Sequence, residues 1–285
     1  MTLFIDLRAT PSGGICANEA RAWEDGTRPV TTGEFAALVH GRDLMLATHG
    51  FNVSRGEGIK ALSCWERICE LPPACLFIGV LWPGDSRFIP VLNYPFEGDD
   101  AMACGRLLAG FLNREAVGAA SISLISHSLG ARVVLEAAEH LNRKVRRLIL
   151  MAGAIEDDCL VEEYASAARN AEKIYTLASK KDRVLQFAFP IGNPVGEIVM
   201  RGHPYFDAAI GREGPSIPIS LEQQGGAWQI PRDWDYGHGD YLPDDPVAQK
   251  IPLPVVAPAP QTQPGTHFEG WKPAWSASAV STQVS

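Results

Sequence analysis

The chain has 285 residues, of which 46% are hydrophobic and 20% are charged, with a formal net charge of −8 and a pI near 5.4. This balance is typical of a globular protein with a buried core, and the length fits one large domain plus a tail. The acidic charge offers no basic surface for nucleic acid, and no apolar run approaches the roughly 18 residues that a membrane span needs.

Strand-length apolar runs alternate with segments of helical period along the first 180 residues. In chain order the predicted elements are a strand at Leu3–Leu7, a strand at Leu44–Thr48, a helix at Gly58–Glu70, a strand at Cys75–Trp82, a helix at Asp99–Leu112, a strand at Ser121–Ser126, a helix at Leu129–Leu141, a strand at Arg147–Met151, a helix at Val161–Ala171 and a strand at Ile174–Ala178. Near-continuous apolar strands are typical of parallel sheets. The pattern predicts an α/β fold, a mostly parallel central sheet with helices on both faces.

The pattern weakens in the last third of the chain. Pro190–Pro231 has scattered Gly and Pro and predicts a long loop with one strand near Ser216–Ser220. After Ile251 the chain is rich in Pro, Ala, Ser, Thr and Gln, a composition that buries too little apolar surface to fold alone. We therefore expect one domain over residues 1–250 and a tail over 251–285, disordered or docked on the domain through Trp271 and Trp275.

The six cysteines form no CxxC pair and no zinc-ligand spacing, so we expect most of them to be buried apolar residues in a reducing compartment. Met1–Thr10 carries Asp6 in a short apolar stretch and lacks the basic and long apolar regions of a secretory signal. The sequence thus predicts a cytoplasmic protein with no membrane span. It does not indicate an oligomeric state.

Ser126-His127-Ser128-Leu129-Gly130 lies between a predicted strand and a predicted helix. A nucleophilic serine stands at a sharp strand-to-helix turn whose neighbours are small, and Ser126 replaces the usual first Gly of that G-x-S-x-G pattern. The helix start then offers the Leu129 amide to a developing oxyanion. Ser126 or Ser128 as a simple helix N-cap is the alternative. The motif predicts Ser128 as a nucleophile.

His49-Gly50-Phe51-Asn52 follows an earlier strand, where serine hydrolases supply the second oxyanion amide, here assigned to Phe51. Leu46–Asn52, Trp82-Pro83, Ser126–Gly130 and later Asp and His motifs resemble the DUF900 group of the α/β-hydrolase superfamily. The resemblance covers Asp43–Pro243. It implies the α/β-hydrolase fold and hydrolytic chemistry on poorly defined substrates.

A serine hydroxyl needs a base, and the base needs an acid; in this fold the order is Ser, Asp or Glu, His. Asp182 follows the strand at Ile174–Ala178, and the resemblance places it in an "NDxVL"-like segment with Lys181 for Asn. Asp157 and Asp158, one strand earlier, remain alternatives for the acid.

The same order restricts the base. Four histidines follow Ser128, but His140 precedes every candidate acid, His203 lies in the variable loop and His267 in the tail. His238 occupies a Gly-flanked late loop that resembles the family's "HSDY" motif, with Gly239 for Ser. His238 is the predicted base, while His49 and His127 are assigned structural roles without proton transfer.

The predicted activity is hydrolysis of an acyl bond in a small molecule, most simply a carboxylic ester, through a Ser128-His238-Asp182 triad and an acyl-enzyme. An acyltransferase, a thioesterase or amidase, and a non-catalytic binding module on the same fold are the alternatives. No metal or other cofactor is implied. The short connection after Met151 predicts no separate lid domain, so the loop Pro190–Pro231 is expected to shape specificity.

Overall fold

The computed structural model describes residues 1–10, 15–69, 71–85, 94–186, 208–216, 224–230, 232 and 235–241. Within these residues, one sheet contains the strands β1 (Leu3–Arg8), β2 (Cys16–Glu24), β3 (Arg28–Val30), β4 (Asp43–Thr48), β5 (Cys75–Leu81), β6 (Ser121–His127), β7 (Val145–Met151), β8 (Ala171–Ala178) and β9 (Gln224–Gln229). The labelled helices are α1 (Thr32–Val39), α2 (Arg55–Ile68), α3 (Tyr94–Glu115), α4 (Gly130–His140), α5 (Ala165–Asn170) and α7 (Ile210–Glu213).

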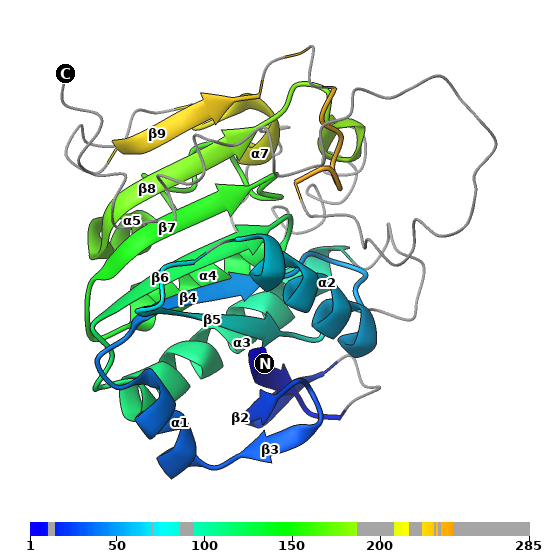
Figure 1. Cartoon of the computed structure of the whole chain (residues 1–285). Coiled ribbons are helices and arrows are strands. Elements are labelled where there is room, and N and C mark those ends of the chain that lie inside the picture. Colours follow the sequence, from blue (N-terminus) through cyan, green and yellow to red (C-terminus); the bar gives the residue numbers. More distant parts are fainter. Residues whose placement is uncertain are drawn as a thin grey trace.

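The sheet is mostly parallel, with the strand order β3-β2-β1-β5-β4-β6-β7-β8-β9 (Figure 1). The β1–β2 and β2–β3 pairs are antiparallel, whereas every pair from β1–β5 to β8–β9 is parallel. The central strands β4 and β6 are buried along almost their whole length, as parallel strands covered on both faces must be. The carboxyl ends of the parallel strands therefore meet at one edge of the sheet.

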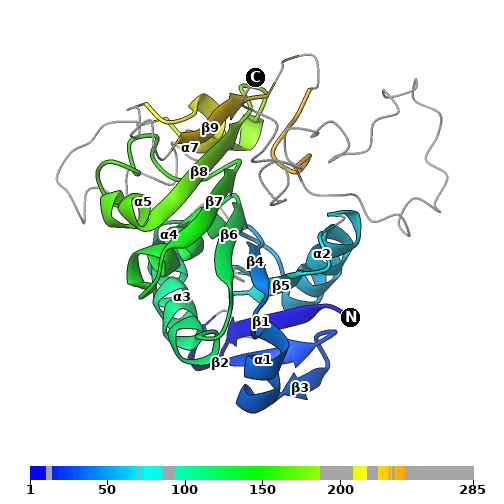
Figure 2. The same ribbon diagram turned by 60° about the vertical axis from the view of Figure 1, so that its left-hand side comes forward.

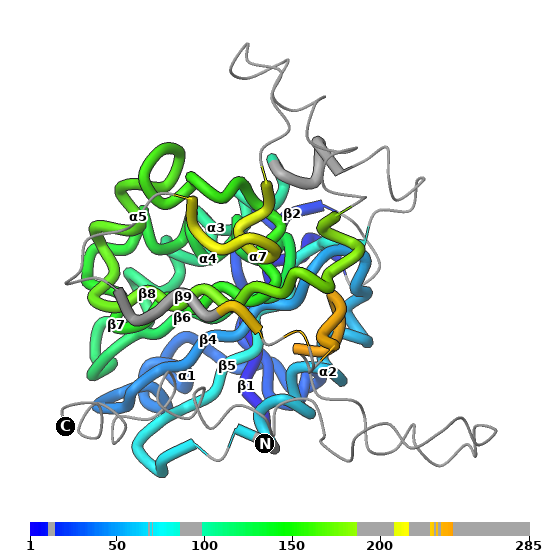
Figure 3. Tube along the Cα trace, turned by 90° about the horizontal axis from the view of Figure 1, so that it is seen from above, coloured from blue at the N-terminus to red at the C-terminus, as the bar shows by residue number. Residues whose placement is uncertain are grey.

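Helices cover both faces of the sheet. Figures 2 and 3 show α3, α4 and α5 on one face and α2 on the other. The α3–α4 pair packs closely because Gly105 has no side chain. A Cβ at this position would lie 2.5 Å from the Glu136 Cβ and 2.7 Å from the Val133 carbonyl oxygen. The predicted fold class, a mostly parallel sheet with helices on both faces, is confirmed.

The predicted elements up to Ala178 are all present, with shifted ends. Helix α3 begins at Tyr94, well before the predicted Asp99, and the helix predicted at Val161–Ala171 is reduced to α5 because turns occupy residues 157–164. The sequence interpretation did not identify β2, β3 or α1. Helix α1 has a capping box, in which Thr31 accepts from the Glu34 amide and Glu34 accepts from the Thr31 amide.

The prediction of a loop over Pro190–Pro231 is wrong in part. This range contains α7 and β9, and β9 extends the sheet beyond β8. The strand expected near Ser216–Ser220 is not at Ser216, which lies in a bend, and residues 217–220 are outside the described residues. The predicted tail, 251–285, also falls outside them.

No helix among the described residues is both long enough and apolar enough to cross a membrane. All six cysteines are free; Cys64, Cys104 and Cys159 are buried, and the other three are half-buried. Burial raises the pKa of Cys75 to about 11, so this thiol stays protonated at neutral pH.

Candidate active site

Ser128 stands at a strained turn between β6 and α4. Its φ of 54° lies in the left-handed region, which a residue with a side chain occupies only when its surroundings impose it. They do so here, because the Ser128 amide donates to the Met151 carbonyl at 3.0 Å and the Ser128 carbonyl accepts from Ala131 and Ala154. The turn holds the Ser128 side chain at the carboxyl edge of the sheet, as the sequence predicted for a nucleophile elbow.

Small residues around this turn allow the ends of β4 and β6 to approach each other. A Cβ at Gly130 would lie 2.5 Å from the His49 carbonyl oxygen, and a Cβ at Gly50 would lie 2.9 Å from the Ser128 Cβ. Ser126, which replaces the usual Gly, is fully buried. The His49-Gly50 and Ser128-Gly130 motifs are therefore parts of one packed unit, which explains why both positions are glycine.

His238 lies between Ser128 and Asp182. Its Nε2 is 2.8 Å from Ser128 Oγ, and its Nδ1 is 2.7 Å from Asp182 Oδ2. A carboxylate oxygen only accepts, so Nδ1 carries the proton and Nε2 is free to accept the Ser128 hydroxyl proton. The three residues predicted as nucleophile, base and acid are brought together by three separate segments of the chain.

Asp182 is fixed by burial and by a second hydrogen bond. The residue has no exposed surface, and its Oδ1 accepts from the Leu185 amide at 2.9 Å. It lies in the turn that follows β8, which the Asp182 amide closes by donating to the Ser179 carbonyl. Each carboxylate oxygen thus has its own donor, which orients Oδ2 toward His238.

The segment Asp235–Tyr241, orange in Figure 1, carries His238 and is tied to the sheet by side chains. Ser179 Oγ donates to the Tyr236 carbonyl at 2.6 Å, and Lys181 Nζ lies 2.9 Å from Asp235 Oδ1. His127 Nε2 donates to the carbonyl of His238 itself at 2.6 Å. These bonds place a segment from late in the chain beside a serine 110 residues earlier.

His127 and His49 are buried neutral histidines. Burial, together with the nearby His238, lowers the pKa of His127 to about 4, and burial lowers the pKa of His49 to about 3. His49 Nδ1 donates to the Gly50 carbonyl at 2.9 Å, while its Nε2 accepts from the Trp82 amide at 3.3 Å. Both rings therefore act as fixed hydrogen-bonding groups in the walls of the site.

Trp82 packs under the segment that follows β4. It is fully buried, and its indole Nε1 donates to the His49 carbonyl at 2.8 Å. The next turn is held by the Asn52 amide, which donates to the Gly84 carbonyl at 2.6 Å. The segment His49–Asn52 is thus anchored on both sides of Phe51.

Phe51 and Leu129, the residues assigned as oxyanion donors, flank this packed unit. Within the part of the chain that the structure describes, neither the Phe51 nor the Leu129 amide N–H has an acceptor. Leu129 is the N-cap of α4, where the first amides of a helix lack intrahelical partners. Unfilled amides beside a nucleophile are what an oxyanion hole requires.

The remaining candidates lie elsewhere. Asp157 and Asp158 are half-buried in the turns after β7, and the carboxylate bonded to His238 belongs to Asp182. His140 is at the end of α4, where its Nδ1 is 2.9 Å from the Glu136 carbonyl. His203 and His267 fall outside the described residues. Sequence reasoning missed Ser179 and the hydrogen bond of His127. The only sequence signal for them was that Ser179 lies three residues before Asp182 and that His127 precedes Ser128.

A family model described as an alpha/beta hydrolase of unknown function, DUF900, matches residues 34–214. No curated protein matches the sequence. Among solved structures, a crystal structure of esterase PE8 resembles the chain with a TM-score of 0.36 and 17% sequence identity, covering 68% of this chain and 88% of that one. The matched family range contains Ser128, Asp182 and the His49–Asn52 segment.

Proposed function

Since the chain belongs to the DUF900 family of α/β hydrolases, we propose that it is a serine hydrolase that cleaves a carboxylic ester through Ser128, His238 and Asp182. The hydrolase class follows from the family; the triad and the ester substrate are our proposal. One observation carries it, the continuous hydrogen-bonded chain from Ser128 Oγ through both His238 ring nitrogens to the buried Asp182 carboxylate. A structural serine has no need of a base that is itself oriented by an acid.

In the proposed first half-reaction, His238 Nε2 takes the Ser128 proton as Oγ attacks the ester carbonyl. The Phe51 and Leu129 amides donate to the resulting oxyanion, a contribution of about 2.7–4 kcal/mol for each donor in serine hydrolases. Asp182 stabilises the imidazolium. His238 then gives the proton to the departing alcohol, and the acyl group remains on Ser128 Oγ.

In the second half-reaction, His238 takes a proton from water, and the hydroxide attacks the acyl-enzyme at the same carbonyl carbon. The carboxylic acid leaves as His238 returns the proton to Ser128. His127 serves as a positioning residue in both steps because its hydrogen bond holds the backbone of His238. Its low pKa keeps it neutral beside His238 at neutral pH.

We propose that the hydrolase domain spans residues 1–250, that the chain over 251–285 forms a tail, and that the protein acts in the cytoplasm on a small acyl substrate. The connection between β7 and α5, residues 152–164, forms short turns packed against α7, which supports the absence of an inserted lid at this place. Specificity is then set by the segment Pro190–Pro231, outside α7 and β9. Exchanging residues of this segment should change the acyl-chain preference, and an unchanged preference would contradict this assignment.

The test is hydrolysis of p-nitrophenyl esters of increasing acyl length by the wild type and by Ser128→Ala. We expect turnover of at least one ester by the wild type and a loss of about 10³-fold or more in kcat/KM for the variant. Equal rates for the two proteins would sink the proposal. Product analysis with an added alcohol separates the alternatives: a transferred acyl group identifies an acyltransferase, and an inert, folded wild type points to a binding module.

A further inference from the structure

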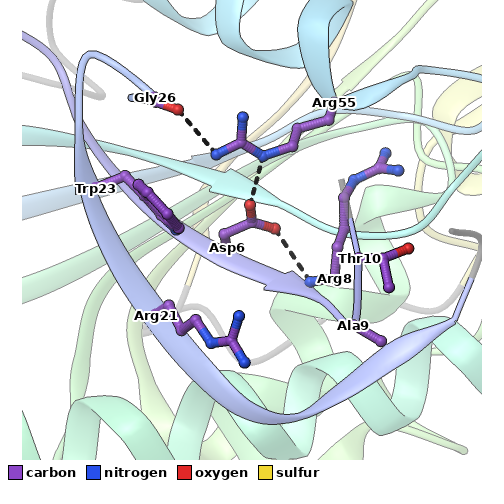
Figure 4. Close-up of a pocket in the computed structure, with 8 residues that line it drawn as sticks. All are labelled: Asp6, Arg8, Ala9, Thr10, Arg21, Trp23, Gly26 and Arg55. Atoms are coloured by element: carbon purple, nitrogen blue, oxygen red, sulfur yellow. Dashed lines mark hydrogen bonds and ion pairs between the residues drawn. The ribbon is translucent and has the colours of Figure 1, made fainter. Parts of the chain in front are cut away.

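A second polar site lies where the antiparallel end of the sheet meets α2. Asp6 on β1 is directly opposite Arg21 on β2, so both side chains point to the same face of the sheet. Trp23, two residues beyond Arg21 on β2, lies on the same face, and Arg8 lines the cavity from β1 beyond an irregularity in the β1–β2 pairing. Arg55, the first residue of α2, completes a cavity of about 120 Å³, shown in Figure 4 and called here the arginine cavity.

The arginine cavity has more positive than negative charge, since three arginines and one aspartate line it. Arg55 Nε is 2.6 Å from Asp6 Oδ2, and Arg55 Nη2 donates to the Gly26 carbonyl at 2.9 Å (Figure 4). Asp6 Oδ1 accepts from the Arg8 amide at 3.1 Å. Both oxygens of the single lining carboxylate are therefore in use.

The groups in the cavity that lack a hydrogen-bond partner are N–H donors. Arg8 is 3% exposed, and its Nε has no hydrogen-bond acceptor among the residues that the structure describes, although its Nη atoms bind Asp85 and the Val53 carbonyl. Within the same residues, the buried indole Nε1 of Trp23 also has no hydrogen-bond acceptor. The exposed guanidinium of Arg21 forms no ion pair within the described residues. Buried N–H groups without acceptors are rare in folded proteins.

We propose that the arginine cavity binds a small anion rich in oxygen, a carboxylate or a phosphate group. The oxygen atoms of such a group accept hydrogen bonds from Arg8 Nε and Trp23 Nε1, and its negative charge pairs with the Arg21 guanidinium. The planar guanidinium matches the geometry of a carboxylate and of a phosphate. Water would supply acceptors without the charge. The cavity is far smaller than the roughly 300 Å³ of a pocket for a drug-sized ligand, so it holds one such group rather than a whole large molecule.

The cavity is linked to the proposed active site through Arg8. Its Nη2 donates to the Val53 carbonyl at 2.7 Å, two residues beyond Phe51. Its ion-pair partner, Asp85, follows Gly84, whose carbonyl accepts from the Asn52 amide. An anion bound to Arg8 is therefore connected, through the contacts of Arg8 with Val53 and Asp85, to both segments that anchor Phe51.

The binding test is NMR of the Trp23 indole Nε1–H in the full-length Ser128→Ala protein, so that its result does not depend on catalysis. Trp23→Phe identifies the resonance. We expect inorganic phosphate or acetate to shift it in a saturable way, with sodium chloride at equal ionic strength having no such effect. Arg21→Gln should weaken the affinity at least tenfold.

The matched control is Arg114→Gln, which removes another exposed charge, at the end of α3. It should bind the anion as the parent does. No shift of the Trp23 resonance, or the same affinity in the Arg21 and Arg114 variants, would overturn the proposal.

Two activity measurements in the Ser128-containing protein then identify the source of the anion. If the anionic group belongs to the substrate, Arg21→Gln raises KM for a carboxylate-bearing ester by a larger factor than KM for its neutral analogue, and Arg114→Gln changes neither. If a free anion is bound, phosphate changes the hydrolysis of the neutral ester in the wild type and not in Arg21→Gln.

Discussion

The two halves of the proposed active site are held in different ways. Around Ser128 the ends of β4 and β6 approach so closely that Gly50 and Gly130 have no room for a side chain. The segment Asp235–Tyr241 has no such backbone packing against Ser128; side chains of Ser179, Lys181 and His127 bind it instead. The serine half should therefore be sensitive to added volume, and the histidine half to the loss of single donors or acceptors.

The largest effect is expected from Asp182→Asn in the histidine half. In this variant the side-chain amide oxygen accepts from the Leu185 amide, so the side-chain NH₂ group faces His238 Nδ1. Nδ1 must then accept a hydrogen bond, and the ring proton moves to Nε2, where it faces Ser128 Oγ. We expect kcat/KM for a reactive ester to fall by about 10⁴-fold. Asp235→Asn is the control, because its exposed ion pair with Lys181 contributes little. Activity within tenfold of the wild type would argue against Asp182 as the acid.

Gly130→Ala tests the serine half. The added methyl would meet the His49 carbonyl at 2.5 Å and push the Phe51 segment away from Ser128. We expect a loss of about 10²–10³-fold in kcat/KM, the size of losing one oxyanion donor. Steady-state kinetics and circular dichroism measure the activity and the fold.

Gly110→Ala in α3 is the matched control for that substitution. Its added Cβ meets only the end of the Arg114 side chain, at 3.6 Å. Ala is the better helix former, so the free energy of unfolding should rise by about 0.5–1 kcal/mol with activity unchanged. Equal activity in the two variants would show that tight packing at Gly130 is irrelevant to the site.

His127→Phe should have a smaller effect, about tenfold on kcat/KM, because it removes one hydrogen bond to the His238 carbonyl and keeps a buried ring. His127→Gln should recover much of the loss, since its amide places a donor near the position of Nε2. Rates of Ser128 acylation, measured in single turnovers, report this directly. If Phe and Gln behave alike, the hydrogen bond does not position His238.

The smallest expected effect is on the free energy of unfolding. It depends on pH through one buried histidine in each half, His49 and His127. The folded-state pKa values of His49 and His127, about 3 and about 4, lie below the unfolded value of 6.5. Between pH 6.5 and about 4 the unfolded chain binds more protons, so stability is complete above pH 6.5 and is lost as the pH falls. Each histidine should lower the free energy of unfolding by about 2 kcal/mol at pH 5 relative to pH 7.5.

Urea unfolding at several pH values measures this loss. His127→Gln should remove about half of the pH dependence. A free energy of unfolding that stays constant from pH 7.5 to pH 5 would mean that neither ring is held neutral.

Much of this site could be predicted from local sequence. The Ser128 turn and the His49–Asn52 segment are short motifs at strand ends, and parallel strands bring their carboxyl ends to one edge. His238 and Asp182 required the order of triad residues along the chain, because nothing local shows that residues 56 positions apart are in contact. The proton-transfer roles of all three remain predictions.

Other features could not be predicted, for physical reasons. β9 contains Gly225, Gly226 and polar residues, and it is recognisable as a strand only through its pairing with β8. β2 is half-exposed along most of its length, so it lacks a continuous apolar run. The arginine cavity depends on that unrecognised strand, because Asp6 and Arg21 face each other only once β1 and β2 pair.

The most direct test of the account is intact-protein mass spectrometry after incubation with a fluorophosphonate, which reacts with a serine activated by an adjacent base. The account predicts one added phosphonyl group on the wild type, mapped to Ser128, and none on Ser128→Ala. Folded wild type that stays unlabelled, or labelling that persists in the variant, would contradict the claim that His238 activates Ser128.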